Sequence, residues 1–282
     1  MKIPMISLFN LPAHCRAIAD LFRILVRRRE LTLEMAKREV TERYRGQVLG
    51  TVWTILHPLI LILVYIFLFV LVFRIRIGGT REMPLDYTTY ILAGLIPWLT
   101  IQDVLAKSAQ AILSSRNLVK QIVFPVEVLP AKTVIASMTT FVISLVILLV
   151  YVIATQPRLF WTYALLPVLA VLLFLILIGI SFFLATVGVF LRDVKDFVQV
   201  FNFVGFFLIP MFYLPAQVPG PLRPILYINP FSYVIWCFQD ALYFGAIRHP
   251  WAWAVMAVMA LLLPAAGYRF FNRLRNMFGN VL

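Results

Sequence analysis

The chain has 282 residues, of which 62% are hydrophobic and only 13% are charged, and its mean hydropathy is +0.94. Soluble domains are about half apolar, so this composition excludes a soluble globular protein and predicts an integral membrane protein. A net charge of +13 would favour a nucleic-acid partner in a soluble chain. Here the basic residues lie between apolar runs instead of on one polar face, so we expect no nucleic acid to bind.

Six segments approach the length of about 20 apolar residues that a helix needs to cross a bilayer. The second is marginal because it contains Gly94, Pro97, Gln102 and Asp103. We divide the chain into an N-terminal extension (1–30), an interface helix (31–50), a transmembrane domain (51–270) and a tail (271–282). The fold class is all-α, and the predicted spans lie near residues 52–73, 87–105, 134–154, 159–191, 197–214 and 251–267.

The distribution of lysine and arginine predicts the orientation, because positive residues are retained in the cytoplasm. With both termini inside, 19 of the 25 basic residues lie on the cytoplasmic side and six outside. An even number of spans agrees with this arrangement. The N-terminus lacks a compact apolar region followed by a cleavage site, so we expect no cleaved signal peptide.

The segment before the first span has the pattern of a helix on the membrane surface. Apolar residues recur every three or four positions, and Glu34/Arg38 and Glu39/Arg43 form i,i+4 pairs on the polar side. Gly46 and Gly50 would let the chain turn into the first span. A plain soluble extension is the alternative. The apolar positions are Leu33, Ala36, Val40, Tyr44 and Val48, and the interface residues that we single out are Arg38, Val40, Arg43, Tyr44 and Arg45.

The cytoplasmic connection at residues 114–132 combines basic and apolar side chains and ends in two prolines. A short amphipathic helix with apolar residues facing the cytoplasm indicates a protein partner. The alternative is a basic membrane anchor without a partner. The residues expected to make the contact are Arg116, Asn117, Leu118, Val119, Lys120 and Ile122.

The outer connection, residues 213–250, is proline-rich and then strongly apolar, with a break at Asn229 and Pro230. This composition favours short re-entrant or interfacial helices over a solvated loop. A seventh span at residues 231–245 is the alternative, but it would place the basic C-terminal cluster outside.

Recognised catalytic patterns are missing from the sequence. There is no G-x-x-x-x-G-K-[ST] loop, no HExxH and no paired-carboxylate spacing near a span, and Cys15 and Cys237 lie far apart without a CxxC motif. We therefore expect no metal site, no disulfide, no enzymatic activity and no ATP site of this kind. Asp103 and Asp240 are the carboxylates inside apolar runs, and we expect them to face a cavity or to be solvated at helix ends.

Several motifs resemble one known family. The stretch "RYRGQVLGTVWTILHPL" (43–59) is similar to the start of the first span in ABC-2-type permeases, especially those that export O-antigen, capsular polysaccharide or teichoic acid. "GLIPW", "FPVEVLP", "LRDVKD" and "YINPFSY" follow in the order found in that family. The resemblance covers residues 30–270, and Gln47 departs from the usual Ser or Thr.

This resemblance implies the membrane subunit of an ATP-driven exporter in the inner membrane of a bacterium. Two copies of the chain would pair, and two copies of a separate ATPase, which binds ATP and Mg, would attach below them. It further implies a coupling helix at residues 114–124 and two short outer helices within 216–245. An exporter of drugs or lipids, or a membrane enzyme acting on lipid-linked sugars, remains as an alternative.

In that family the first and fifth spans line the conduit. Aromatic rings can stack on the C–H faces of sugars, although rings in spans more often pack against protein or lipid. The candidate conduit aromatics are Tyr65, Phe69, Phe73, Phe203, Phe207 and Tyr213, and the candidate outer gate comprises Pro219, Pro221, Asn229 and Pro230.

Overall fold

The computed structural model describes residues 11–72, 85–120, 124–155, 160–214 and 218–281. Every regular element in these ranges is a helix. For residues 11–17, 69–71 and 280 the structure describes the backbone alone. The all-helical class expected from the sequence is confirmed for the described residues.

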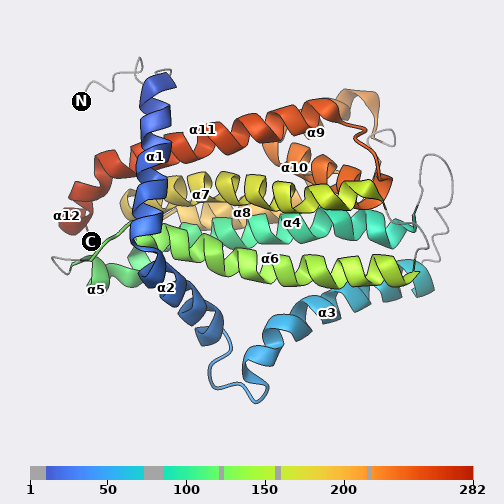
Figure 1. Ribbon diagram of the computed structural model, residues 1–282, viewed down its shortest axis with the longest axis horizontal. Coiled ribbons are helices and arrows are strands. Elements are labelled where there is room, and N and C mark those ends of the chain that lie inside the picture. Colours follow the sequence, from blue (N-terminus) through green and yellow to red (C-terminus); the bar gives the residue numbers. More distant parts are fainter. Residues whose placement is uncertain (1–10, 73–84, 121–123, 156–159, 215–217, 282) are drawn as a thin grey trace.

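Four long helices lie side by side and form the centre of the molecule (Figure 1). They are α4 (Tyr87–Ser108), α6 (Val128–Thr155), α7 (Leu166–Phe190, preceded by the 3-10 helix η5, Trp161–Leu165) and α11 (Pro250–Leu274). Each is long and apolar enough to cross a membrane. The second, third, fourth and sixth predicted spans are therefore present as membrane-length helices, and the chain is an integral membrane protein.

Helix α4, which the sequence marks as marginal, is the most enclosed of the four. Of its 18-residue apolar stretch, 78% is buried within the protein. A Cβ on Gly94 would lie 2.8 Å from Ile235 Cγ2 and 2.9 Å from Met211 Cβ, so glycine is needed for this approach. Small and polar residues in α4 contact neighbouring helices and not lipid, which explains why its hydropathy is low.

The closest helix crossing joins α7 to α11. A Cβ on Gly267 would lie 2.0 Å from the carbonyl oxygen of Gly179, and a Cβ on Gly179 would lie 2.2 Å from the carbonyl carbon of Leu263. Backbone approach of this kind is typical of small residues between membrane helices. The crossing fixes α11 against α7 at the level of these glycines.

We predict that Gly267→Ala destabilises the protein, because the added methyl group meets backbone atoms that cannot rotate away. Overpacking of this type costs about 1–3 kcal/mol. Thermal unfolding of the purified protein in detergent should show a lower midpoint. The matched control is Gly279→Ala, where a Cβ would meet no atom within 4 Å. Equal midpoints for the two variants would contradict this account of the crossing.

The first and fifth predicted spans are less regular. The first is helical from Gly50 to Val72, through a 3-10 turn (η2, Gly50–Val52), α3 (Trp53–Ile66) and a π-helical stretch (η3, Phe67–Val72). The fifth, α8 (Val194–Leu208), has 15 residues and ends where Ile209 becomes extended. At about 1.5 Å per residue it is shorter than a hydrocarbon core of about 30 Å. Helix α8 thus ends six residues before the predicted boundary at residue 214.

The outer connection forms two short helices, α9 (Arg223–Ile228) and α10 (Pro230–Gln239). A 3-10 turn (η7, Gly220–Leu222) precedes them, and a π-helical turn (η8, Asp240–Phe244) follows. The predicted break is confirmed at Asn229, whose side-chain oxygen accepts a hydrogen bond from the backbone N–H of Phe231 at 3.0 Å. Helix α10 is buried against α4 and α11.

At the opposite end of the bundle lie α1 (Leu11–Arg27), α2 (Arg29–Glu42), α5 (Arg116–Val119) and α12 (Phe278–Val281) (Figure 1). Two 3-10 turns, η4 (Leu113–Ser115) and η9 (Arg275–Met277), lie next to α5 and α12. Helix α1 crosses this end of the bundle, with Leu21 buried in the common core. The N-terminal extension is thus partly an ordered helix that packs on α11.

Candidate functional site

Helix α2 packs on α6 and does not present the single apolar stripe expected from the sequence. Thr32 and Ala36 are buried, whereas Leu33 is 54% exposed. The helix ends at Glu42, so Val48 lies beyond it and does not extend its apolar face. The Val48 side chain is fully exposed. The chain then turns through Gly46 and Gly50, with φ of 80° and 49°. The expectation that glycines form the turn into the first span is confirmed. Of the interface residues, Val40 and Tyr44 are half-buried, and Arg38 and Arg45 are exposed.

The expected ion pairs within α2 are wrong. Among the described residues, Arg38 pairs with Glu42 at 2.6 Å and not with Glu34. The hydrogen bond from Arg38 lowers the pKa of Glu42. Arg43 reaches across to Asp103 instead of Glu39. The sequence could not supply the partner of Arg43, because Arg43 and Asp103 are 60 residues apart.

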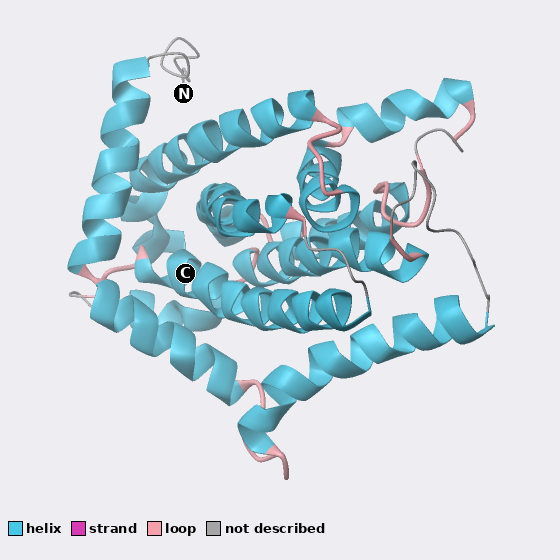
Figure 2. Ribbon diagram, turned by 45° about the vertical axis from the view of Figure 1, so that its right-hand side comes forward, coloured by secondary structure: helices cyan, strands magenta, loops and turns pink. Residues whose placement is uncertain are grey.

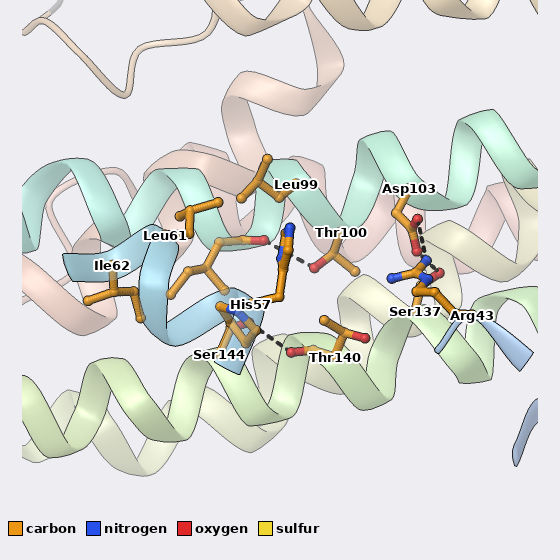
Figure 3. A pocket seen from close by; sticks show the side chains of 12 residues that line it. Arg43, His57, Leu61, Ile62, Leu99, Thr100, Asp103, Ser137, Thr140 and Ser144 are labelled. Atoms are coloured by element: carbon orange, nitrogen blue, oxygen red, sulfur yellow. Dashed lines mark hydrogen bonds and ion pairs between the residues drawn. The ribbon is translucent and has the colours of Figure 1, made fainter. Parts of the chain in front are cut away.

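Asp103 holds together three segments of the chain at this end of the bundle. One of its carboxylate oxygens lies 2.9 Å from Arg43 Nη2, and the other accepts from Lys107 Nζ at 2.6 Å and from Ser137 Oγ at 2.6 Å. Partial burial disfavours the charged form of Arg43, but the Asp103 carboxylate and the Tyr44 side chain together outweigh it, and the pKa of Arg43 is raised. Figure 3 shows the Arg43, Asp103 and Ser137 side chains converging.

A cavity of about 190 Å³ lies beside this cluster, between α3, α4 and α6. Arg43 and Asp103 stand at one end of it, and His57 projects into it from α3 (Figure 3). The expectation that Asp103 faces a cavity is confirmed. The remaining lining residues are Pro58, Leu61, Ile62, Ile96, Leu99, Thr100, Ser137, Thr140 and Ser144.

Asp240 is fully buried, so the expectation of a solvated or cavity-facing carboxylate is wrong for this residue. Its oxygens accept hydrogen bonds from the backbone N–H of His249 at 2.9 Å and from Trp253 Nε1 at 3.1 Å, and one lies 2.8 Å from His249 Nδ1. The carboxylate thereby joins the end of α10 to the start of α11. The sequence alone does not reveal this pairing, because Asp240 and His249 are nine residues apart and match no helical spacing.

The predicted coupling helix is shorter than expected. Helix α5 covers Arg116–Val119, and Ile122 lies outside the described residues. Arg116, Asn117 and Lys120 are exposed, but Leu118 and Val119 are only half-buried and Val119 packs on the core. The surface available to a partner is therefore mainly polar.

The candidate conduit aromatics do not share one environment. Phe203 and Phe207 are 69% and 57% exposed on α8, with ring centroids 5.6 Å apart. Tyr65 and Tyr213 are half-buried. Tyr213 lies beyond the end of α8 and donates to the carbonyl oxygen of Phe207 at 3.0 Å. Phe73 and the side chain of Phe69 lie outside the described residues.

The candidate outer gate residues lie at the start of the two short helices. Pro219, Pro221 and Pro230 are exposed, and Asn229 caps α10. The described residues contain no group of three or more His, Cys, Asp or Glu side chains that could hold a metal ion.

The sequence profile of the ABC-2 type transporter family matches residues 30–243, which include every long helix except α1 and α11. The chain belongs to this family. Two relatives from Klebsiella pneumoniae are 24% and 25% identical over 90% of this chain and 95% of their own lengths. A relative from Myxococcus xanthus is 29% identical over 90% of this chain and 96% of its own length. All three carry the name O-antigen export system permease protein RfbA.

The family resemblance indicated by the motifs is thus confirmed. As a member of the ABC-2 type transporter family, this chain is a transporter component. The family generally works with a separate ATPase subunit. The individual functions expected for the coupling, conduit and gate residues stay predictions.

Proposed function

We propose that the chain is the membrane subunit of an ATP-driven exporter that moves a polysaccharide, joined to a lipid carrier, across the inner membrane of a bacterium. The main support is its similarity to permeases named for O-antigen export, which extends over nearly the whole of both chains. A bundle of membrane-length helices without a recognised phosphate-binding loop is consistent with a subunit that relies on ATP bound elsewhere.

In the proposed topology the chain crosses the membrane six times, with both termini in the cytoplasm. The first crossing is the helical segment from Gly50 to Val72, and α8 provides the fifth. Helices α9 and α10 enter from the outer side and return without crossing. The excess of basic residues on the side of α1, α2 and α5 supports this orientation.

The exporter would contain two copies of this chain and two copies of a separate ATPase, which binds ATP and Mg. The exposed face of α8 supports pairing, because Phe197, Val200 and Phe203 are 71%, 63% and 69% exposed in the single chain. Such a face must contact lipid or a second copy. Binding of ATP to the partner would shift the pair between two states through contacts at α5.

Deletion of the gene in its host tests the proposal. We expect the polysaccharide to disappear from the cell surface and to accumulate on the inner side of the membrane, with both effects reversed by the wild-type gene. Normal surface polysaccharide together with altered resistance to drugs, or altered lipid composition, would instead favour an exporter of those compounds.

Labelling with a thiol reagent that does not cross membranes tests the topology. Gly220 and Arg248 are both exposed and lie on either side of the two short outer helices. Cysteines are introduced singly at these positions in a background lacking Cys15 and Cys237. Both should react in cells whose outer barrier has been opened and whose inner membrane is intact. A cysteine introduced at the exposed residue Lys37 should react only after lysis. Reaction at only one outer position would indicate a seventh span.

A further inference from the structure

We propose that Asp103 and Glu39 are positioning residues that couple the ATPase-facing loop to the first span. Together with Arg43, Lys107 and Lys132 they form a cluster that we call the clamp, which joins α2 to α4 and α6. The clamp makes these three elements move as one body during a transport cycle. This inference rests on the proposed function, because it requires an ATP-driven partner.

The first half of the clamp centres on Asp103. This carboxylate lies 2.9 Å from Arg43, which caps α2, and 2.6 Å from both Lys107 of α4 and Ser137 of α6. A single side chain therefore contacts all three elements. Removing its charge would leave Arg43 and Lys107 without their nearest described carboxylate.

The second half centres on Glu39 of α2. Its oxygens lie 3.3 Å from Lys132 of α6 and 3.9 Å from Lys107 of α4. Lys107 thus belongs to both halves. The clamp side chains are between 18% and 37% exposed, so water screens their interactions less than those of a surface pair. The Arg38–Glu42 pair on the same helix is 74% and 46% exposed and lies outside the clamp.

The clamp holds both ends of the loop that carries α5. Lys107 precedes the last residue of α4, and Lys132 lies in the first turns of α6. A force on α5 would therefore act on the two helix ends that the clamp joins to α2. It would also act on α2 itself, although α2 makes no direct connection to α5 along the chain.

Beyond the clamp, α2 leads into α3 through a turn that contains Gly46 and Gly50 (Figure 2). Both glycines have φ in the left-handed region, and a Cβ on either would meet no atom within 4 Å. Helix α3 packs on α6, and part of its inner face lines the cavity next to Arg43. A firmly held helix, a turn and a helix that borders a cavity therefore follow one another along the chain. Movement of the clamp would be transmitted to α3.

The test measures polysaccharide exported per ATP hydrolysed by the full transporter in proteoliposomes. Asp103→Asn and Glu39→Gln keep the shape of each side chain and remove its charge. We expect both variants to bind the ATPase and to hydrolyse ATP, but to export less polymer per ATP. A loss of roughly 2- to 30-fold corresponds to the usual size of such coupling.

Two further variants separate coupling from folding. Glu39→Lys combined with Lys132→Glu exchanges the charges of one pair, and we expect it to recover part of the ratio lost in Glu39→Lys alone. Glu42→Gln removes the exposed carboxylate of the same helix, and we expect it to leave the ratio unchanged. The loss in Glu39→Lys and its recovery in the double variant would not follow if only the amount of folded protein mattered, because the ratio is measured per ATP.

An unchanged ratio in Asp103→Asn and Glu39→Gln would overturn the inference. So would lower protein abundance with an unchanged ratio in the surviving molecules, since the clamp would then be structural only. If the wild-type chain neither binds an ATPase nor exports polymer, the proposed function fails and the inference fails with it. The wild-type measurement therefore distinguishes failure of the proposed function from failure of the clamp inference alone.

Discussion

Reversing the charge on the exposed side of α5 is expected to prevent recovery of the ATPase with the purified permease. The variant that we would make combines Arg116→Glu with Leu118→Asp. Arg116 is exposed, and Leu118 is half-buried beside it. Val119 is left intact because it packs on the core. Loss of a central interface contact costs about 2 kcal/mol, which is roughly 30-fold in affinity.

Copurification from membranes measures this effect, with the amount of ATPase recovered expressed per copy of permease. The control is Leu222→Asp, which changes a residue that is 51% exposed at the opposite end of the bundle. We expect the control to recover the ATPase normally. If the α5 variant also recovers it normally and exports polymer at the wild-type rate, α5 is not the contact.

Removing the exposed rings of α8 should have the second large effect. Phe203 and Phe207 lie one helical turn apart and are mostly exposed, so Phe203→Ala combined with Phe207→Ala leaves no cavity in the core of the single chain. Aromatic contacts of this kind contribute about 0.5–1.5 kcal/mol each. We therefore expect normal abundance but roughly tenfold less export per copy of permease.

The matched control is Phe141→Ala, because Phe141 is buried in the core at 1% exposure and packs against Phe238. A buried Phe→Ala change costs about 3–5 kcal/mol, so abundance should fall while export per copy stays constant. If the α8 variant behaves like Phe141→Ala, its rings contribute to stability or pairing and not to the conduit. Surface polymer and permease abundance measured in the same cells distinguish the two results.

The sequence predicted the long helices well because the length of an apolar run reflects the thickness of the bilayer. It was less informative about α4, since hydropathy does not distinguish a segment surrounded by protein from one that crosses poorly. Gly94 and Asp103 lowered the hydropathy of α4, and both are explained by contacts with other helices. The break at Asn229 was predictable because a proline follows a residue that can cap a helix.

The candidate site was harder to predict because its contacts are distant in sequence. The periodic stripe correctly indicated a helix before the first span, but the pattern continued to Val48 while the helix stops at Glu42. The i,i+4 rule assigned Arg43 to Glu39, although a carboxylate on another helix lies closer to it. Local periodicity contains no information about such partners. Asp240 and His249 illustrate the same limit at the opposite end of the bundle.

Reconstitution tests the central claim most directly. The purified chain would be placed in proteoliposomes with its candidate ATPase partner and a lipid-linked polysaccharide, both from the same host. A lectin-based assay would measure polymer on the side opposite the ATPase. An ATP-driven polysaccharide exporter should move the polymer only with ATP and Mg, and a partner unable to hydrolyse ATP should abolish transfer. Transfer at the same rate without ATP, or stimulated ATP hydrolysis with no polymer crossing, would contradict the account.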